Sequence, residues 1–299
     1  MKVSIIIPNY NGAELLKKNL PKVMTASGNA EIIVVDDCST DNSIEILEDF
    51  PVSVIRNEKN LGFSPTVNKG VKEASGEIVV LLNTDVSPEK DFLIPLLDHF
   101  KDEKVFAVGC MDKSIEGSKT VLRGRGLGKW ERGFLVHRRG DVDKTNTLWV
   151  NGGSGAFRKS IWEKLGGFNE LYSPFYWEDI DISYRALKSG YGIFFEQKSI
   201  VIHEHEKGAI KNKYSQFNIK TIAYRNQFIF VWLNITDFSL VLSHIFWLSY
   251  HFINAIRRKD SAFFLGFMKA LLLFVKILES RRKIKGLFKR KDKEIFILS

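Results

Sequence analysis

The sequence predicts an α/β protein: a Rossmann-like, mostly parallel sheet flanked by helices, followed by an amphipathic helical tail. Two observations predict the sheet. Short apolar, β-branched segments alternate with helical patterns through the first hundred residues, and three of these segments end in polar, partly acidic residues. A third observation predicts the tail, because the last sixty residues combine apolar helical stretches with an excess of basic residues.

Four apolar segments are the predicted strands of this sheet. None of them has a polar face, so we expect each strand to be buried on both sides by helices. The strands are residues 3–7, 31–35, 52–56 and 78–82, and the helices between and after them are residues 13–22, 41–49, 64–74 and 89–100. In such sheets ligands bind beyond the carboxyl ends of the strands, so the residues that follow each strand are the first candidates for a site.

The rest of the chain divides by composition. Residues 111–147 are rich in Gly, Arg and Lys with weak periodicity, which predicts a mobile excursion rather than core. A compact block follows, with helices at 160–165 and 179–189 and strands at 192–195 and 199–203. We therefore expect one domain over residues 1–215, built from halves at 1–110 and 148–215, and a tail at 216–299.

The net charge of +9 is concentrated in the tail. Residues 240–299 hold 13 Lys or Arg and 4 Asp or Glu, so the remainder is balanced. This distribution argues against a nucleic-acid binder and for a local anionic partner, for which a membrane surface is the natural candidate. The two cysteines, Cys38 and Cys110, exclude a disulfide framework. The apolar run after Met1 is too short for a signal-peptide core, so we expect a cytoplasmic location, peripheral on the inner face of the cell membrane.

Polar residues follow three of the predicted strands. They are Pro8-Asn9-Tyr10-Asn11 after the first, Asp36-Asp37 after the second and Asn83-Thr84-Asp85 after the fourth. Helix capping explains one such residue at each position. Five of the six residues from 36 to 41 are Asp, Ser or Thr, however, which is more than one cap requires. An acid at the end of a buried strand also suits a hard divalent cation.

A second acidic cluster lies at the expected start of the helix at 179–189. The segment Trp177-Glu178-Asp179-Ile180-Asp181 puts three carboxylates within four positions. Favourable placement in the field of the helix explains one or two of them. Aromatic residues precede the acids directly. A carboxylate beside aromatic rings is suited to proton transfer, and the rings are suited to stacking on a sugar. His203, at the end of a predicted strand, is by itself more often structural.

Taken together, these segments resemble the inverting family-two glycosyltransferases of the GT-A fold. The resemblance covers about residues 1–210 and is closest to the branch that holds rhamnosyl- and other cell-surface polysaccharide transferases. The matching segments are residues 3–11, 34–41, 60–63, 68–70, 81–85, 166–170, 177–181 and His203. The resemblance implies hexosyl or deoxyhexosyl transfer from a nucleotide-sugar donor to a lipid-linked or polysaccharide acceptor, with a divalent cation, Mg²⁺ or Mn²⁺. Residues 1–110 would bind the nucleotide and residues 148–215 the acceptor.

The resemblance also implies a role for each matched position. Asp179 would be the catalytic base, with Trp177 and Glu178 beside the acceptor. Asp85 and His203 would hold the metal, and Asn83 departs from the family pattern because an amide replaces an acid there. The nucleotide-sugar would be bound by Pro8, Asn9, Tyr10, Asp37, Lys69, Asn83 and Asp85.

Two apolar helical segments make up most of the tail, residues 238–256 and 262–278. In the first, Ser243, His244 and His251 share one side; in the second, a face with Phe263 and Phe267 opposes the lysines. Such helices are typical of peptides that lie in a membrane interface, and we favour that reading. A transmembrane hairpin and packing on the catalytic domain are the alternatives. Because the expected site residues end at His203, the segment after Thr236 should add location and not chemistry.

Two other functions compete with the transferase. A sugar-phosphate nucleotidyltransferase also binds nucleotides on an α/β sheet, but it should have a Gly-rich, Arg-containing loop after the first strand, and residues 8–12 do not form one. A catalytically degenerate binder of nucleotide-sugars is supported only by Asn83. Turnover of the donor separates this alternative from an enzyme.

Overall fold

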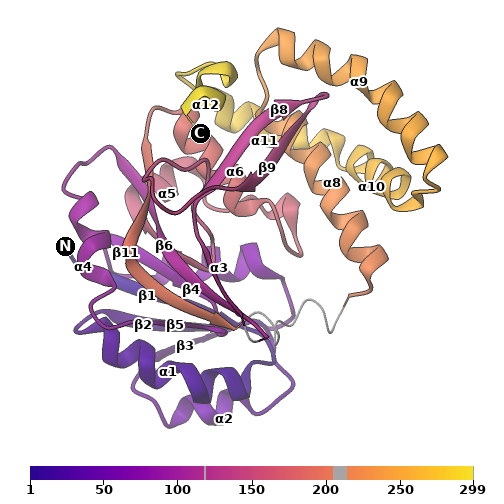
Figure 1. The fold of residues 1–299 in the computed structure, drawn as a ribbon. Helices are drawn as coiled ribbons and strands as arrows, with labels where there is room; N and C mark the ends of the chain where they lie inside the picture. The colour runs from indigo at the N-terminus through magenta and orange to yellow at the C-terminus, as the bar shows by residue number, and fades with distance from the viewer. Residues whose placement is uncertain (118, 205–213, 299) are drawn as a thin grey trace.

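The computed structural model describes residues 1–117, 119–204 and 214–298 (Figure 1). The strands are β1 (Val3–Asn9), β2 (Glu31–Asp36), β3 (Ser53–Arg56), β4 (Ile78–Leu82), β5 (Val86–Pro88), β6 (Val105–Glu116), β7 (Lys119–Arg123), β8 (Gly126–Glu131), β9 (Phe134–Arg139), β10 (Ser154–Arg158) and β11 (Gly192–Glu204). The helices are α1 (Ala13–Ser27), α2 (Ser43–Glu48), α3 (Phe63–Glu73), α4 (Leu93–His99), α5 (Lys159–Leu165), α6 (Glu178–Lys188), α8 (Gln216–Asn234), α9 (Phe238–Arg257), α10 (Ser261–Leu272), α11 (Phe274–Lys285) and α12 (Asp292–Leu298). A 3₁₀ turn, η1, covers Glu170–Tyr172.

The main sheet has the order β3-β2-β1-β4-β10-β6-β11-β5, and β7 pairs with β6. Strands β3, β2, β1 and β4 are parallel to one another, as are β6 and β11, while β10 runs antiparallel between β4 and β6. The predicted α/β class with a mostly parallel sheet is therefore confirmed. The sheet separates two apolar clusters, one under α1 and α4 and a larger one that reaches into the C-terminal helices.

The prediction that residues 52–56 are buried on both faces is wrong. Ser53, Val54 and Arg56 are exposed, because β3 is the edge strand and pairs only with β2. An edge strand has no neighbour on one side, so an apolar composition alone does not place it inside the sheet. The strands predicted at 192–195 and 199–203 are one strand, β11, with irregular pairing between Glu196 and Ile200.

Residues 111–147 were expected to form a mobile excursion, and this prediction is wrong. They continue β6 and form β7 and the β8–β9 hairpin, whose Phe134 and Leu135 are buried in the larger core. The two-residue periodicity was hidden by glycines. A Cβ atom at Gly126 would lie 2.3 Å from the ring of Trp149, so only glycine fits at this position of the strand. Because glycine has no side chain, the sequence shows no apolar residue there to indicate the buried face.

Helices α8 to α12 lie against the rest of the chain (Figure 1). Phe228, Phe230 and Leu233 of α8 are buried in the same core as Trp177, and the Phe228 ring lies 5.1 Å from that of Phe134 on β9. The boundary expected at residue 216 stays a prediction, but the helices beyond it share the core of the domain.

The second apolar segment of the tail differs from the expected single helix. It forms α10 and α11, which meet at a bend of 62°. Its phenylalanine face was expected to lie in a membrane, and this expectation is wrong: Phe263 and Phe267 pack on Phe228 of α8, with ring centroids 5.6 and 5.2 Å away. Within the described residues, α9 is long and apolar enough to cross a membrane, and α10 with α11 passes the same test only if the bent pair is one span.

Candidate active site

The carboxyl ends of β1 and β2 meet in register at Asn9 and Asp36. Asn9 is buried, and its amide donates to the Asp36 carboxylate at 2.8 Å and to Ser39 at 3.2 Å. The Asn9 amide nitrogen therefore holds the turn after β2. Pro8 and Tyr10, the other two residues predicted to bind the nucleotide here, are half-buried at the same rim.

Asp37 ties a neighbouring loop to this rim. Its carboxylate accepts hydrogen bonds at 2.8 Å from the backbone N–H groups of Leu61 and Gly62 and from the side chain of Asn57. Lys69 of α3 donates to the Asn57 side chain at 2.9 Å, so Asp37 and Lys69 belong to one network. Asn57 was not among the predicted residues, although it follows the edge strand β3 and the strand-end rule applies to it.

Asp85, in the turn after β4, lies close to His203, on β11. His203 Nε2 lies 3.2 Å from Asp85 Oδ2, while its Nδ1 lies 3.0 Å from a carboxylate oxygen of Asp112 on β6. Burial lowers the pKa of His203, but its hydrogen bonds and charge interactions with both aspartates outweigh burial and raise that pKa to about 9. Asp112 is itself held by Ser114 at 2.9 Å.

This pair fits a divalent cation in chemistry if the cation displaces the proton on His203 Nε2, because histidine binds a metal in its neutral form. Asp85 Oδ1 is buried and has no hydrogen-bond partner within the described residues, so it is an acceptor in need of a positive group. Asp112 orients the His203 ring from behind, as carboxylates do behind metal-binding histidines. No cluster of three or more His, Cys, Asp or Glu side chains suited to a metal occurs in the described ranges, so substrate oxygens would have to complete the coordination. Asn83, predicted to bind the nucleotide-sugar, lies against Gly153.

The acids of the second cluster stand at the start of α6. Tyr176 and Trp177 both have positive φ, 72° and 80°, which turns the chain sharply into the helix. Burial raises the pKa of Asp179 to about 6, although hydrogen bonds from the backbone N–H groups of Ile180 and Gly152 lower it. Burial and the neighbouring Asp179 raise the pKa of Glu178 to about 8. Asp179 is thus suited to be ionised near neutral pH, and Glu178 to be protonated.

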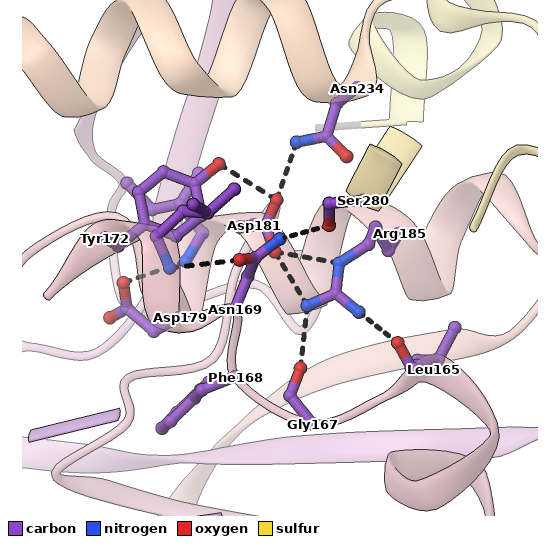
Figure 2. Close-up of polar contacts among 12 residues, drawn as sticks. Leu165, Gly167, Phe168, Asn169, Tyr172, Asp179, Asp181, Arg185, Asn234 and Ser280 are labelled. Carbon is purple, nitrogen blue, oxygen red and sulfur yellow. Dashed lines mark hydrogen bonds and ion pairs between the residues drawn. The ribbon is translucent and has the colours of Figure 1, made fainter. Parts of the chain in front are cut away.

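Asp181, the third acid, is fully engaged in structure (Figure 2). It forms a buried ion pair with Arg185 at 2.7 Å and accepts hydrogen bonds from the Tyr172 hydroxyl at 3.0 Å and the Asn234 amide at 2.6 Å. Arg185 also donates to the backbone oxygens of the 165–167 turn. Figure 2 shows Asp179 apart from these contacts. The network anchors α6 and leaves Asp179 and Glu178 as the candidate acids.

The aromatic residues before the acids divide into two kinds. Trp177, predicted to face the acceptor, is buried, with ring centroids 5.3 Å from His137 and 5.2 Å from Phe230. Tyr176 is 42% exposed, so it is the ring of this segment that a ligand can reach.

Gly152 and Gly153 join the two halves of the site. The backbone oxygen of Gly153 accepts a hydrogen bond from the Asn83 N–H at 3.0 Å, and the N–H of Gly152 donates to Asp179. A Cβ atom at Gly153 would lie 2.4 Å from the Asn83 side chain, so the backbone must approach closely there. Asp179 and the residues after β4 are therefore bridged by adjacent residues of one loop.

The family model for glycosyl transferase family 2 matches residues 4–166, more than half of the chain. The chain belongs to glycosyl transferase family 2. Among curated relatives, dolichol-phosphate mannosyltransferase of Pyrococcus furiosus is 36% identical over 125 residues, which cover 40% of this chain and 35% of that protein. O-antigen chain rhamnosyltransferase RfbN of Salmonella typhimurium is 24% identical over 213 residues, 69% of this chain and 67% of that protein.

Solved structures agree with the family at the level of the fold. The crystal structure of GalNAc-T7 with UDP, GalNAc and Mn²⁺ aligns with a TM-score of 0.73 at 18% identity, over 99% of this chain and 56% of that one. The chain thus has the GT-A fold of family-2 glycosyltransferases. It spans about a third to a half of the length of the first curated relatives it matches.

The family-2 match ends at residue 166, before Asp179 and His203. The roles implied for these two residues, and for the nucleotide-binding positions, stay predictions whose geometry is described above. Two residues at the site were missed by sequence reasoning. Asn57 could have been predicted, because it directly follows a strand and ligands bind beyond strand ends. Nothing in the sequence pairs Asp112 with His203, 91 residues away.

Proposed function

We propose that this chain is an inverting glycosyltransferase that moves a hexosyl or deoxyhexosyl group from a nucleotide-diphosphate sugar to a hydroxyl group of an acceptor. The observation that carries the proposal is the pairing of two sites across the Gly152–Gly153 loop. One side presents Asp179, which has a raised pKa and whose hydrogen bonds within the described residues come from backbone N–H groups. The other presents Asp85 and His203, which suit a metal and a diphosphate.

The chemistry follows from these groups. An acceptor hydroxyl has a pKa far above neutral, so a carboxylate within hydrogen-bond reach must take its proton as the new bond to the anomeric carbon forms. Asp179 is ionised above about pH 6 and fills this role. Attack from the face opposite the leaving nucleoside diphosphate inverts the anomeric configuration and needs no covalent enzyme intermediate. Glu178, the more protonated neighbour, would hold the acceptor through a hydrogen bond.

A divalent cation, Mg²⁺ or Mn²⁺, held by Asp85 and His203, would neutralise the charge on the leaving diphosphate. Asp112 would keep Nδ1 of His203 protonated and its Nε2 directed at Asp85. Support for the cation comes from the donor set and from GalNAc-T7, which was solved with UDP and Mn²⁺. Asn83 would contact the donor through its amide, and the rim at Pro8, Tyr10 and Asp37 would receive the nucleoside.

The acceptor side of the proposal rests on α9. Two of its polar residues face the protein: His244 is buried against the Gly133 backbone oxygen at 2.7 Å, and Ser243 accepts a hydrogen bond from Trp130 at 3.2 Å. Several of its large apolar residues face outward, with Phe238 75% and Phe246 73% exposed. An apolar helix face beside a basic segment suits the interface of an anionic membrane.

We therefore place the enzyme on the cytoplasmic face of the cell membrane, where a lipid-linked or polysaccharide acceptor of cell-envelope synthesis would be within reach. Relatives support this direction, because RfbN is an O-antigen chain rhamnosyltransferase. The membership of family 2 favours a transferase over the nucleotidyltransferase alternative.

The test is turnover of purified protein against a panel of nucleotide-sugars, with and without Mn²⁺, in the presence of membrane-extracted acceptors. We expect release of a nucleoside diphosphate from one donor, lost on Asp179→Asn while nucleotide binding is retained. Binding of a donor without any release of nucleoside diphosphate would instead identify a degenerate binding protein.

A further inference from the structure

A cavity of about 270 Å³ lies between the tip of the β8–β9 hairpin and helices α8, α9 and α10. Figure 1 shows these elements side by side, with the hairpin reaching toward the C-terminal helices. The cavity is lined by Glu131, Arg132, Phe134, Val136, Tyr224, Gln227, His251, Asn254, Ala255, Arg258, Asp260 and Phe263. None of these residues belongs to the active site described above.

Within the described residues, the two acids that line the cavity form their ion pairs with lysines and not with its two arginines. Asp260 forms an ion pair with Lys220 at 2.8 Å and accepts the Tyr224 hydroxyl at 2.8 Å. Glu131 pairs with Lys129. Arg258, by contrast, forms no ion pair with an acid anywhere in the described part of the chain.

Arg132 is held in place by aromatic residues rather than by an acid. It sits in the tight turn of the hairpin with φ of 49°, donates to the Tyr250 hydroxyl at 2.9 Å and lies over the Tyr250 ring at 5.1 Å. The His251 ring is fixed by the Arg132 backbone oxygen at 2.7 Å. A guanidinium anchored in this way has less conformational freedom to lose when its remaining N–H groups bind phosphate oxygens.

The lining also has an apolar part. Phe134, Ala255 and Phe263 are buried and line the cavity with the two arginines. A ligand that contacts both kinds of residue carries a phosphate on an apolar group. Arg258 stands at the end of α9, the helix whose outward face is apolar.

We propose that this cavity binds the phosphate headgroup of a glycerophospholipid, with Arg258 and Arg132 on the phosphate and Phe134 and Phe263 beside the adjoining glycerol carbons. The site would select phosphate-bearing lipid within the membrane association proposed above, on which this inference rests. Free phosphate has the same anionic chemistry and lacks the apolar part, so the two sources can be separated experimentally.

The experiment compares two adjacent arginines at the end of α9. Arg258→Gln removes a guanidinium from the cavity, and Arg257→Gln removes the same charge from the same helix end at a residue that does not line the cavity. Both arginines are exposed, so both variants should keep the wild-type melting temperature. The probe is short-chain phosphatidic acid below its micelle concentration, titrated by calorimetry into the full-length protein, with inorganic phosphate as the second probe.

We expect Arg258→Gln to weaken binding of the short-chain lipid by at least about tenfold, the loss of one charge-assisted contact, and Arg257→Gln to change it by less than about twofold. Inorganic phosphate should bind more weakly than the lipid. Equal effects of the two substitutions, or no effect of either, would overturn the cavity assignment. Equal affinity for inorganic phosphate would overturn the lipid assignment.

A separate measurement keeps the two proposals distinguishable. Cosedimentation with phosphatidylcholine vesicles containing phosphatidylglycerol tests membrane association, and the short-chain titration needs no membrane. Vesicle binding without the Arg258 effect rejects the cavity alone. An Arg258 effect without vesicle binding rejects the membrane proposal and leaves a cavity for soluble phosphate esters.

Discussion

Substitution of Asp292 by alanine should destabilise the whole domain, although this residue lies only seven positions before Ser299. Asp292 and Lys188 form an ion pair at 2.7 Å in which neither side chain is exposed. The same carboxylate accepts the Tyr184 hydroxyl and the backbone N–H groups of Thr236 and Asp237, each at 2.7 Å. It therefore joins α12, the end of α6 and the connection between α8 and α9.

The magnitude follows from what the substitution leaves behind. Removal of one partner of a buried ion pair costs about 3–5 kcal/mol, because the other charge stays buried without compensation. The orphaned backbone donors add to this, so we expect a loss of at least about 4 kcal/mol in the free energy of unfolding. That is a large part of the roughly 5–15 kcal/mol that stabilises a typical domain.

The loss should depend on pH in a defined direction. Burial lowers the pKa of Lys188, and Asp292 is the largest influence that raises it again. Without Asp292 the folded-state pKa falls further below the unfolded value of about 10.4, so the unfolded chain binds more protons between the two values. The stability of Asp292→Ala should therefore rise with pH over that window, and its deficit should shrink toward pH 10.

Urea unfolding at pH 7 and pH 9 measures both effects. Glu294→Ala is the matched control, since it removes an exposed carboxylate from the same helix and should change stability by less than about 0.5 kcal/mol. Replacing both partners, with Lys188→Met added to Asp292→Asn, should recover most of the loss. A loss below about 1 kcal/mol for Asp292→Ala would refute this reasoning. The contact also means that truncation after Thr236 removes part of the fold, so the tail has to be tested by point substitutions.

Three further predictions concern the site and the membrane face. Asp179→Asn should lower turnover by at least about 10²-fold with unchanged nucleotide affinity, and wild-type activity should fall as pH drops through about 6, where the carboxylate takes up its proton. The pH profiles of both proteins test this prediction. Normal turnover of the variant would assign the role of base to another acid. Asp112→Ala should weaken Mn²⁺-dependent binding of a nucleoside diphosphate by about 10–100-fold, because His203 loses the carboxylate that orients it. Calorimetry measures this affinity. Equal affinity of the wild type with and without metal would contradict the metal assignment. Phe246→Ser should reduce cosedimentation with anionic vesicles by about tenfold. Ile94→Ser, which changes a comparably exposed apolar residue on α4, should not reduce it. Equal effects of the two substitutions would show that the α9 face does not contact the membrane.

Much of the fold and part of the site were predictable because they depend on local order. Alternation of apolar strands with helices determined the α/β class. The rule that ligands bind at strand ends selected Asp37, Asn83 and Asp85 from the sequence alone. The cluster at the start of α6 was visible as a run of acids. Which of them is available for chemistry was not visible, because Asp181 is taken by Arg185 and by Asn234, 53 residues away.

The sequence by itself determined the fold class, the family and the two polar rims, since each of these is written in short segments and their spacing. Only the tertiary structure decided how faces and partners are used. A helical wheel showed that α9 has a polar and an apolar side, but periodicity is the same whichever side turns inward. The β8–β9 hairpin offers hydrogen-bond acceptors to His244 and His251, so here these two histidines turn inward and large apolar residues such as Phe246 are left exposed. Asp112 behind His203 and Asp292 beneath Lys188 were hidden for the same reason: a buried charge is explained by its partner, and the partner is chosen by the fold.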